Sequence, residues 1–174
     1  MIDLVNVSIE ISNLGIKEVN FQSSDGIVVV TGKSGIGKSL VFQIIELIYQ
    51  SRDSSVDLIK SLPENVYLHE PTRFAVASAI DDLNRGDNGL VVLDDLDLIL
   101  DSVQFINNPQ LKKRFLNSIV NSPNEVIVVC KKVPDVFKLP DRFFYNLKIK
   151  NGVATLEQTL REGLYGVVKN DYTL

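Results

Sequence analysis

Residues 32–39 read Gly32-Lys33-Ser34-Gly35-Ile36-Gly37-Lys38-Ser39, and this stretch decides the fold predicted for the chain. Its spacing is G-x-x-x-x-G-K-[ST], the pattern of a loop that binds phosphate groups. The glycines let successive backbone N–H groups turn toward the phosphates, and a helix that follows adds the positive end of its dipole. The stretch therefore predicts a phosphate-binding loop between a strand and a helix.

The residues on both sides of the loop have the character that this arrangement requires. Before it, Ile27 to Thr31 is a short apolar run rich in β-branched residues, which is typical of a buried parallel strand. After it, Leu40 to Ile48 is long enough for a helix and apolar on most faces, so we expect that helix to be largely buried. The predicted nucleotide-binding residues are Gly32, Lys33, Ser34, Gly35, Ile36, Gly37, Lys38, Ser39 and Leu40.

Two side chains of this loop have specific predicted roles. Lys38 would reach the β- and γ-phosphates of a nucleotide, where its charge also makes it a candidate catalytic residue. Ser39 would bind Mg²⁺ through its hydroxyl group. The predicted cofactors are therefore ATP and Mg²⁺.

A second motif consists of the apolar run Leu90 to Leu93 followed by Asp94 and Asp95. By itself this pattern is a weak signal, because many apolar strands end in acidic residues that begin a loop. Since a phosphate-binding loop precedes it, the pattern has the form of a Walker B motif. We expect Asp94 to contribute to the Mg²⁺ site and Asp95 to act as a catalytic residue near the attacking water.

Length and composition indicate one globular domain with no membrane span. The 174 residues are enough to bury a core, and we assign residues 1–156 to a P-loop nucleotide-binding domain and residues 157–174 to its C-terminal helix and tail. The net charge of −4 gives no support for a nucleic-acid partner. The single cysteine, Cys130, excludes an intramolecular disulfide and a cysteine-cluster metal site. With no signal-peptide pattern, a cytoplasmic location is expected.

The remaining hydrophobic pattern predicts an α/β fold with three layers and a mostly parallel central sheet. Apolar residues alternate with polar ones from Val5 to Ile11, and Ile16 to Phe21 forms a second strand, so an antiparallel hairpin precedes the loop. Asn151-Gly152 is a tight-turn signal between two late strands. Further strands are expected at 66–68, 126–129, 143–149 and 153–156, and helices at 56–62, 71–83, 110–120 and from 157 into the tail.

Taken together, these motifs resemble the ATP-binding-cassette ATPases, including their SMC- and RecF-like branch. The loop GKSGIGKS is close to the family's G-x-S-G-x-G-K-S, and Asp94 to Asp101 resembles its Walker B motif and D-loop. The segment from Val126 to Ile149 resembles the switch strand and the strand that follows it. By this resemblance Lys131 stands at the position of the family's switch histidine, where a lysine would stabilise transition-state charge.

The chain also departs from this family. The LSGGQ signature is absent, and the region from His69 to Ala77 resembles the Gln-loop joined almost directly to the helix after the signature. The resemblance therefore implies a reduced cassette without the helical subdomain. Asp95 replaces the catalytic glutamate and is one methylene shorter, which predicts slow hydrolysis. We predict that His69 is a surface residue at a strand end and not a ligand.

Other functional classes compete with a minimal cassette ATPase that acts for a protein partner or as a homo-oligomer. An AAA-type oligomeric motor is favoured by Asp94 to Asp97 and by Leu139 to Phe143, which resembles an arginine-finger segment. A small-molecule kinase would need an arginine-rich lid, which the chain lacks. A GTPase is disfavoured because Cys130 to Val133 lacks the N-K-x-D pattern. A nucleotide-binding module with little or no catalysis is a further alternative.

Overall fold

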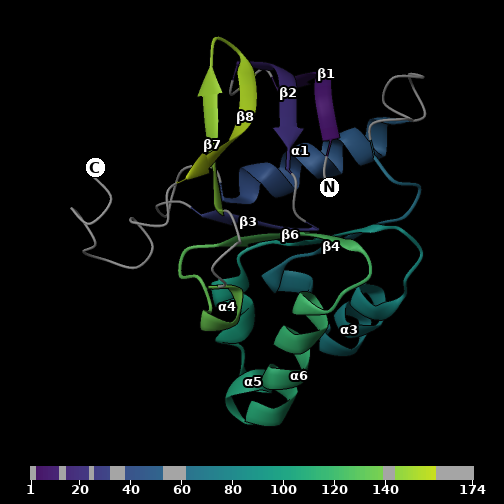
Figure 1. The fold of residues 1–174 in the computed structure, drawn as a ribbon, viewed down its shortest axis with the longest axis vertical. Coiled ribbons are helices and arrows are strands. Elements are labelled where there is room, and N and C mark those ends of the chain that lie inside the picture. The colour runs from purple at the N-terminus through teal and green to yellow at the C-terminus, as the bar shows by residue number, and fades with distance from the viewer. Residues whose placement is uncertain are drawn as a thin grey trace, which may run out of the picture.

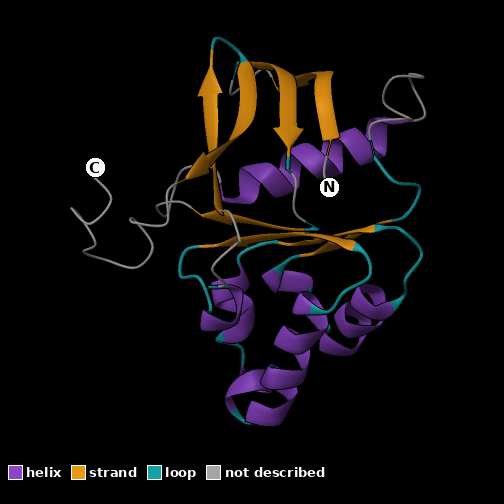
Figure 2. Ribbon diagram, in the orientation of Figure 1, coloured by secondary structure: helices purple, strands orange, loops and turns teal. Residues whose placement is uncertain are grey.

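In a computed structural model, the described parts of the chain are residues 3–11, 15–23, 26–31, 38–52, 62–138 and 144–159. They form an α/β fold with a mixed eight-stranded sheet in the order β1-β2-β8-β7-β3-β6-β5-β4 (Figure 2). The strands are β1 (Asp3–Ile11), β2 (Ile16–Gln22), β3 (Ile27–Thr31), β4 (Val66–His69), β5 (Leu90–Leu93), β6 (Glu125–Cys130), β7 (Phe144–Lys150) and β8 (Val153–Thr159). The α-helices are α1 (Lys38–Ser51), α3 (Val76–Asn84), α4 (Leu96–Leu100), α5 (Val103–Ile106) and α6 (Pro109–Val120), and the 3₁₀ turns are η3 (Pro71–Arg73) and η4 (Asp135–Phe137).

The sheet contains the predicted parallel core. Strand β3 pairs in parallel with β6 on one side and β7 on the other, while β6 pairs with β5 and β5 with β4. All four residues of β5 and the last five of β6 are buried, which explains why these strands are continuous apolar runs without alternation. The prediction of a mostly parallel sheet is confirmed.

The predicted hairpins form the other half of the sheet. Strands β1 and β2 are antiparallel, as are β7 and β8. Asn151 and Gly152 both have positive φ, 53° and 81°, as the tight turn between β7 and β8 requires. Strand β8 also pairs in parallel with β2, so the N-terminal hairpin is joined to the sheet by the last described strand.

Helix α1 lies inside the curled sheet, between the core strands and the hairpins (Figure 1). Its buried side chains, Leu40, Val41, Phe42, Ile44, Ile45 and Ile48, pack against both halves of the sheet. The remaining α-helices cover the opposite face of the core strands, where Phe105, Phe115 and Phe137 are fully enclosed. The prediction of a largely buried first helix is confirmed.

The helix predicted from Pro71 to Leu83 was wrong in its first half. Pro71 begins the short turn η3, Phe74 and Ala75 are extended, and α3 begins only at Val76. The ring of Phe74 lies 5.4 Å from Phe115 and 6.1 Å from Phe105, measured between ring centroids. This aromatic packing outweighs the helical propensity of the segment.

The helix predicted to begin at Glu157 was likewise wrong in its first residues. Residues 157–159 belong to β8 and pair with residues 144–146 of β7. The ladder with β7 satisfies their backbone groups and continues the hairpin. The rest of that prediction, residues 160–174, and most of the helix predicted at 56–62 lie outside the described residues.

No helix in the described part of the chain has both the length and the apolar character needed to span a membrane.

Candidate functional site

The segments predicted to form the site follow parallel strands that end at the same edge of the sheet. Strand β3 ends at Thr31, which is the register partner of Cys130 at the end of β6. Leu93, the last residue of β5, pairs with Val128 of β6. Extending this register by one residue brings Asp94 level with Val129 and Val30. In parallel sheets the ligand crevice lies beyond the carboxyl ends of the strands.

Residues 32–37 of the predicted phosphate-binding loop lie outside the described residues, as do the side chains of Lys38 and Ser39. Its two flanks are described. Strand β3 ends at Thr31 and α1 begins at Lys38, so the predicted strand and helix on either side of the loop are confirmed. The side chain of Leu40 is buried in the core, which leaves only its backbone available to a nucleotide.

Asp94 and Asp95 lie directly after β5. Asp94 is 5% exposed, and its backbone N–H donates to the carbonyl of His69 at 2.9 Å, which ties it to the end of β4. Asp95 is half-buried and adopts the left-handed conformation, with φ 45° and ψ 59°, immediately before α4. Non-glycine residues are uncommon in this region of backbone space, and such strain clusters at functional sites. The predicted catalytic residue is therefore the left-handed link between β5 and α4.

Asp97 makes a contact that the sequence did not predict. One of its carboxylate oxygens accepts the backbone N–H of Lys131 at 2.6 Å, and the other accepts that of Lys132 at 2.8 Å. Both lysine side chains are exposed. The only sequence signal was a third acid close to Asp94 and Asp95, and a run of acids does not identify which one turns toward a neighbouring strand. The contact joins the segment after β5 to the segment after β6.

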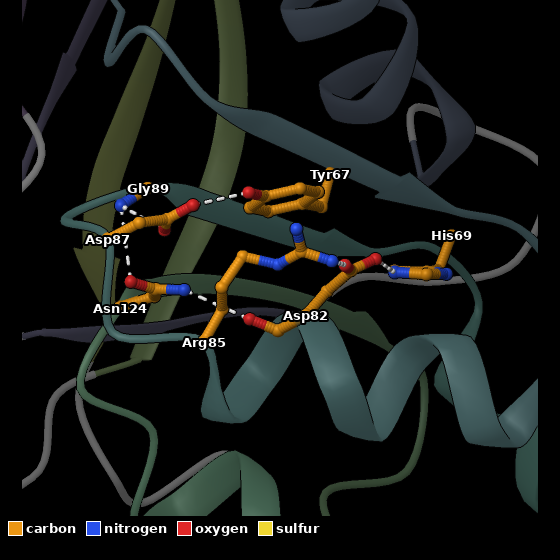
Figure 3. A network of polar contacts seen from close by, with 7 residues as sticks. All are labelled: Tyr67, His69, Asp82, Arg85, Asp87, Gly89 and Asn124. Atoms are coloured by element: carbon orange, nitrogen blue, oxygen red, sulfur yellow. Dashed lines mark hydrogen bonds and ion pairs between the residues drawn. The ribbon is translucent and has the colours of Figure 1, made fainter.

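The prediction that His69 is a surface residue was wrong. His69 is 8% exposed, and its Nε2 atom lies 3.0 Å from Oδ2 of Asp82 on α3 (Figure 3). Asp82 is also buried, and its other oxygen accepts a hydrogen bond from Arg85 at 3.1 Å. Burial lowers the pKa of His69, and the negative charge of Asp82 opposes this shift only in part. His69 therefore has a structural partner and is neutral near pH 7.

The same network continues to the start of β5. The hydroxyl of Tyr67 donates to Asp87, which lowers the pKa of Asp87 and raises that of Tyr67. The backbone N–H of Gly89 donates to Oδ1 of Asp87 and to Oδ1 of Asn124, each at 3.1 Å (Figure 3). These contacts join α3, β4 and the starts of β5 and β6. We assign these contacts a structural role, because they join the ends of neighbouring strands to one another.

Helix α6 carries an exposed cationic surface. Lys113 and Arg114 are exposed, and they line an open hollow of about 400 Å³ with Asn84 and Asn121. Asn84 ends α3, which leads to the start of β5, and Asn121 follows α6, which leads to the start of β6. The hollow therefore lies along α6 beside the end of α3, and none of the predicted site residues lines it.

The described residues contain no group of three or more histidine, cysteine, aspartate or glutamate side chains that could hold a metal ion. In comparisons with known proteins, no protein-family model matched the chain, and no curated protein was significantly similar to it in sequence. The assignment of function therefore depends on the residues at the carboxyl edge of the sheet.

Proposed function

We propose that this chain binds Mg·ATP and hydrolyses it slowly, as a minimal cassette-type ATPase that serves a partner as a switch or motor subunit. The same proposal assigns the fold to the three-layer P-loop NTPases. The observation that supports this most is the convergence of two motifs. The strand before the glycine-rich loop and the strand before Asp94 are parallel, end at the same edge and have only β6 between them.

In this proposal the residues at the carboxyl edge of the sheet have different roles, some in binding and others in charge stabilisation. In the proposal, backbone N–H groups from Gly32 to Leu40 hold the phosphates, and the ammonium group of Lys38 balances charge that amides alone cannot balance. Lys131 follows the strand next to β3 and stabilises charge that develops on the γ-phosphate. Asp95 holds the attacking water and accepts its proton.

The described donor set is compatible with Mg²⁺. Asp94 is a buried carboxylate at the strand end, and Mg²⁺ is usually held by one or two protein oxygens together with phosphates and water. Asp94 and the hydroxyl of Ser39 would hold the ion. When bound, the ion neutralises charge on the β- and γ-phosphates.

Calorimetry with the variant Lys38→Ala tests the binding site. Wild-type protein should bind ATP in the presence of Mg²⁺, and the variant should bind it far more weakly while keeping the same thermal unfolding temperature without nucleotide. Lys113→Ala, which removes an exposed lysine from α6, is the matched control and should bind as the wild type does. Equal affinity in Lys38→Ala and wild type would overturn the assignment of this loop.

Size-exclusion chromatography with and without ATP separates the classes of ATPase. An ATP-dependent dimer is the expected result for a cassette, although the missing LSGGQ signature removes part of the usual contact between subunits. A hexamer would replace this proposal with an AAA-type motor.

A further inference from the structure

We infer that Asp97 is a positioning residue that holds Lys131 in place for the γ-phosphate, an inference that rests on the proposed ATPase function. Asp97 lies on α4, and Lys131 and Lys132 follow β6 directly. Asp97 is far from Lys131 and Lys132 in sequence but forms hydrogen bonds with both in the fold. The carboxylate uses each of its oxygens on one of two successive backbone N–H groups.

Asp97 offers a carboxylate acceptor to these two backbone groups. The hydrogen bonds are short, at 2.6 and 2.8 Å, and bonds to a carboxylate are stronger than bonds between neutral groups. No ion pair of Asp97 with either lysine ammonium group is found in the described part of the chain. The carboxylate therefore contacts the backbone, while both lysine side chains remain exposed.

The two segments that Asp97 joins are each anchored in the core. On one side, Leu96, Ile99 and Leu100 of α4 are buried. On the other, Cys130 is buried before the lysines and Val133 after them. Only residues 131 and 132 between these anchors are exposed, so the carboxylate fixes the one stretch of this strand end that packing does not hold. A side chain held on rigid elements is positioned more accurately than one on a free loop.

The contact also links the two segments that carry the predicted catalytic residues Asp95 and Lys131. Asp95 is separated from Asp97 by one residue and enters α4 through its left-handed turn. In this inference the two hydrogen bonds couple the start of α4 to the backbone of Lys131. Lys131 should therefore contribute to ATP binding only while Asp97 is present.

A double-mutant cycle on the intact chain tests this dependence. ATP and ADP affinities are measured by calorimetry for wild type, Lys131→Ala, Asp97→Asn and the double variant. We expect Lys131→Ala to weaken ATP binding about fivefold or more in the wild-type background and less than about twofold in the Asp97→Asn background. ADP affinity should change little throughout. The matched control is Asp81→Asn, which alters an exposed carboxylate on α3 and should leave the effect of Lys131→Ala intact.

Amide hydrogen exchange without nucleotide gives a second readout. The N–H groups of Lys131 and Lys132 should be protected in the wild type and exchange about tenfold faster in Asp97→Asn, while the ladder amide of Val128 keeps its protection. If Asp97→Asn does not fold, Asp97→Glu serves instead, because it keeps the charge and moves the carboxylate by one methylene.

The outcomes separate this inference from the proposed function. Equal effects of Lys131→Ala in both backgrounds, or unchanged exchange at both lysines, would each overturn the role of Asp97 alone. No effect of Lys131→Ala in a protein that binds ATP would overturn the role of Lys131 together with that of Asp97, and would leave ATP binding in place. Absence of ATP binding by the wild type would overturn the proposed function, and the positioning role with it.

Discussion

At the scale of single residues, Asp95 combines a strained backbone with a predicted catalytic role. The left-handed conformation costs most L-residues roughly 1–2 kcal/mol, whereas glycine adopts it freely. Glycine in turn loses roughly 0.4–1 kcal/mol through the greater entropy of its unfolded chain. The backbone strain outweighs this entropy loss, so we expect Asp95→Gly to be more stable than Asp95→Ala by roughly 0.5–1 kcal/mol in urea unfolding.

Asp95→Gly and Asp95→Ala, together with Asp95→Asn, also test the catalytic role of Asp95. A well-placed base contributes roughly 10²–10⁴-fold in rate, so Asp95→Asn, Asp95→Gly and Asp95→Ala should all hydrolyse ATP at least about tenfold more slowly than the wild type. Because Asp95 is shorter than glutamate, the wild type itself should turn over well below about 10 s⁻¹. Unchanged hydrolysis in Asp95→Asn would leave a nucleotide-binding protein in which Asp95 is not the base.

His69 should make stability depend on pH. Burial lowers its pKa in the folded state below the ordinary value of 6.5, so in acid the unfolded chain binds more protons than the folded one. Stability from the neutral imidazole is therefore present above about pH 6.5 and is lost as the pH falls through that value toward the lowered pKa. Urea unfolding of wild type and His69→Gln at pH 7.5, 6.5 and 5.5 measures this loss.

The variant His69→Gln serves as the control in this experiment, since glutamine can donate to Asp82 without titrating. His69 is the only histidine in the chain, so no other imidazole contributes. As the pH falls, the free energy of unfolding should decrease more for the wild type than for His69→Gln. A constant difference across this range would show that the burial of His69 does not control its protonation.

At the scale of elements, the start of β5 depends on the absence of a side chain at Gly89. A Cβ atom there would lie 2.8 Å from Oδ1 of Asp87, 3.0 Å from the carbonyl of Asn65 and 3.1 Å from the ring of Tyr67. Relieving these contacts would separate β5 from β4 or break the hydrogen bonds of the Gly89 N–H. We expect Gly89→Ala to lower the free energy of unfolding by about 1–3 kcal/mol in urea titration.

Gly26 provides the matched control for this substitution. It also stands directly before a core strand, but a Cβ atom there would meet nothing within 4 Å. Gly26→Ala should therefore be neutral or stabilise the protein by up to about 1 kcal/mol, through the lower entropy of the unfolded chain. Equal losses for the two variants would mean that close packing at β5 is not what requires Gly89.

At the scale of the whole molecule, nucleotide binding should raise stability, because the proposed site joins segments after β3, β5 and β6. A ligand at 100 times its Kd stabilises the folded state by about 2.7 kcal/mol, which corresponds to several degrees in Tm for a chain of this size. Thermal unfolding should show this shift with Mg·ATP and lose most of it when EDTA is added. A shift that Lys38→Ala retains in full would point to a different binding site.

Much of the fold could be predicted from local patterns. Strand β3, helix α1, strand β5 with its two acids, and the turn at Asn151-Gly152 all lie where the sequence indicated. In each case the signal and the structure involve the same short stretch of chain. An apolar run long enough for one element, or a residue pair that tolerates positive φ, is recognisable without knowledge of its neighbours.

The pairings between distant segments were decided only by the tertiary structure. Helix α3 begins at Val76 because Phe74 packs on aromatic rings of α5 and α6, and residues 157–159 are a strand because β7 is beside them. His69 is buried because α3 brings Asp82 to it, and Asp97 reaches Lys131 because β6 lies next to β5. Sequence by itself therefore determined the core strands, the first helix and the candidate phosphate and acid motifs. Partners in space determined the bounds of α3 and β8 together with burial, protonation and register, because these depend on which surfaces exclude water together.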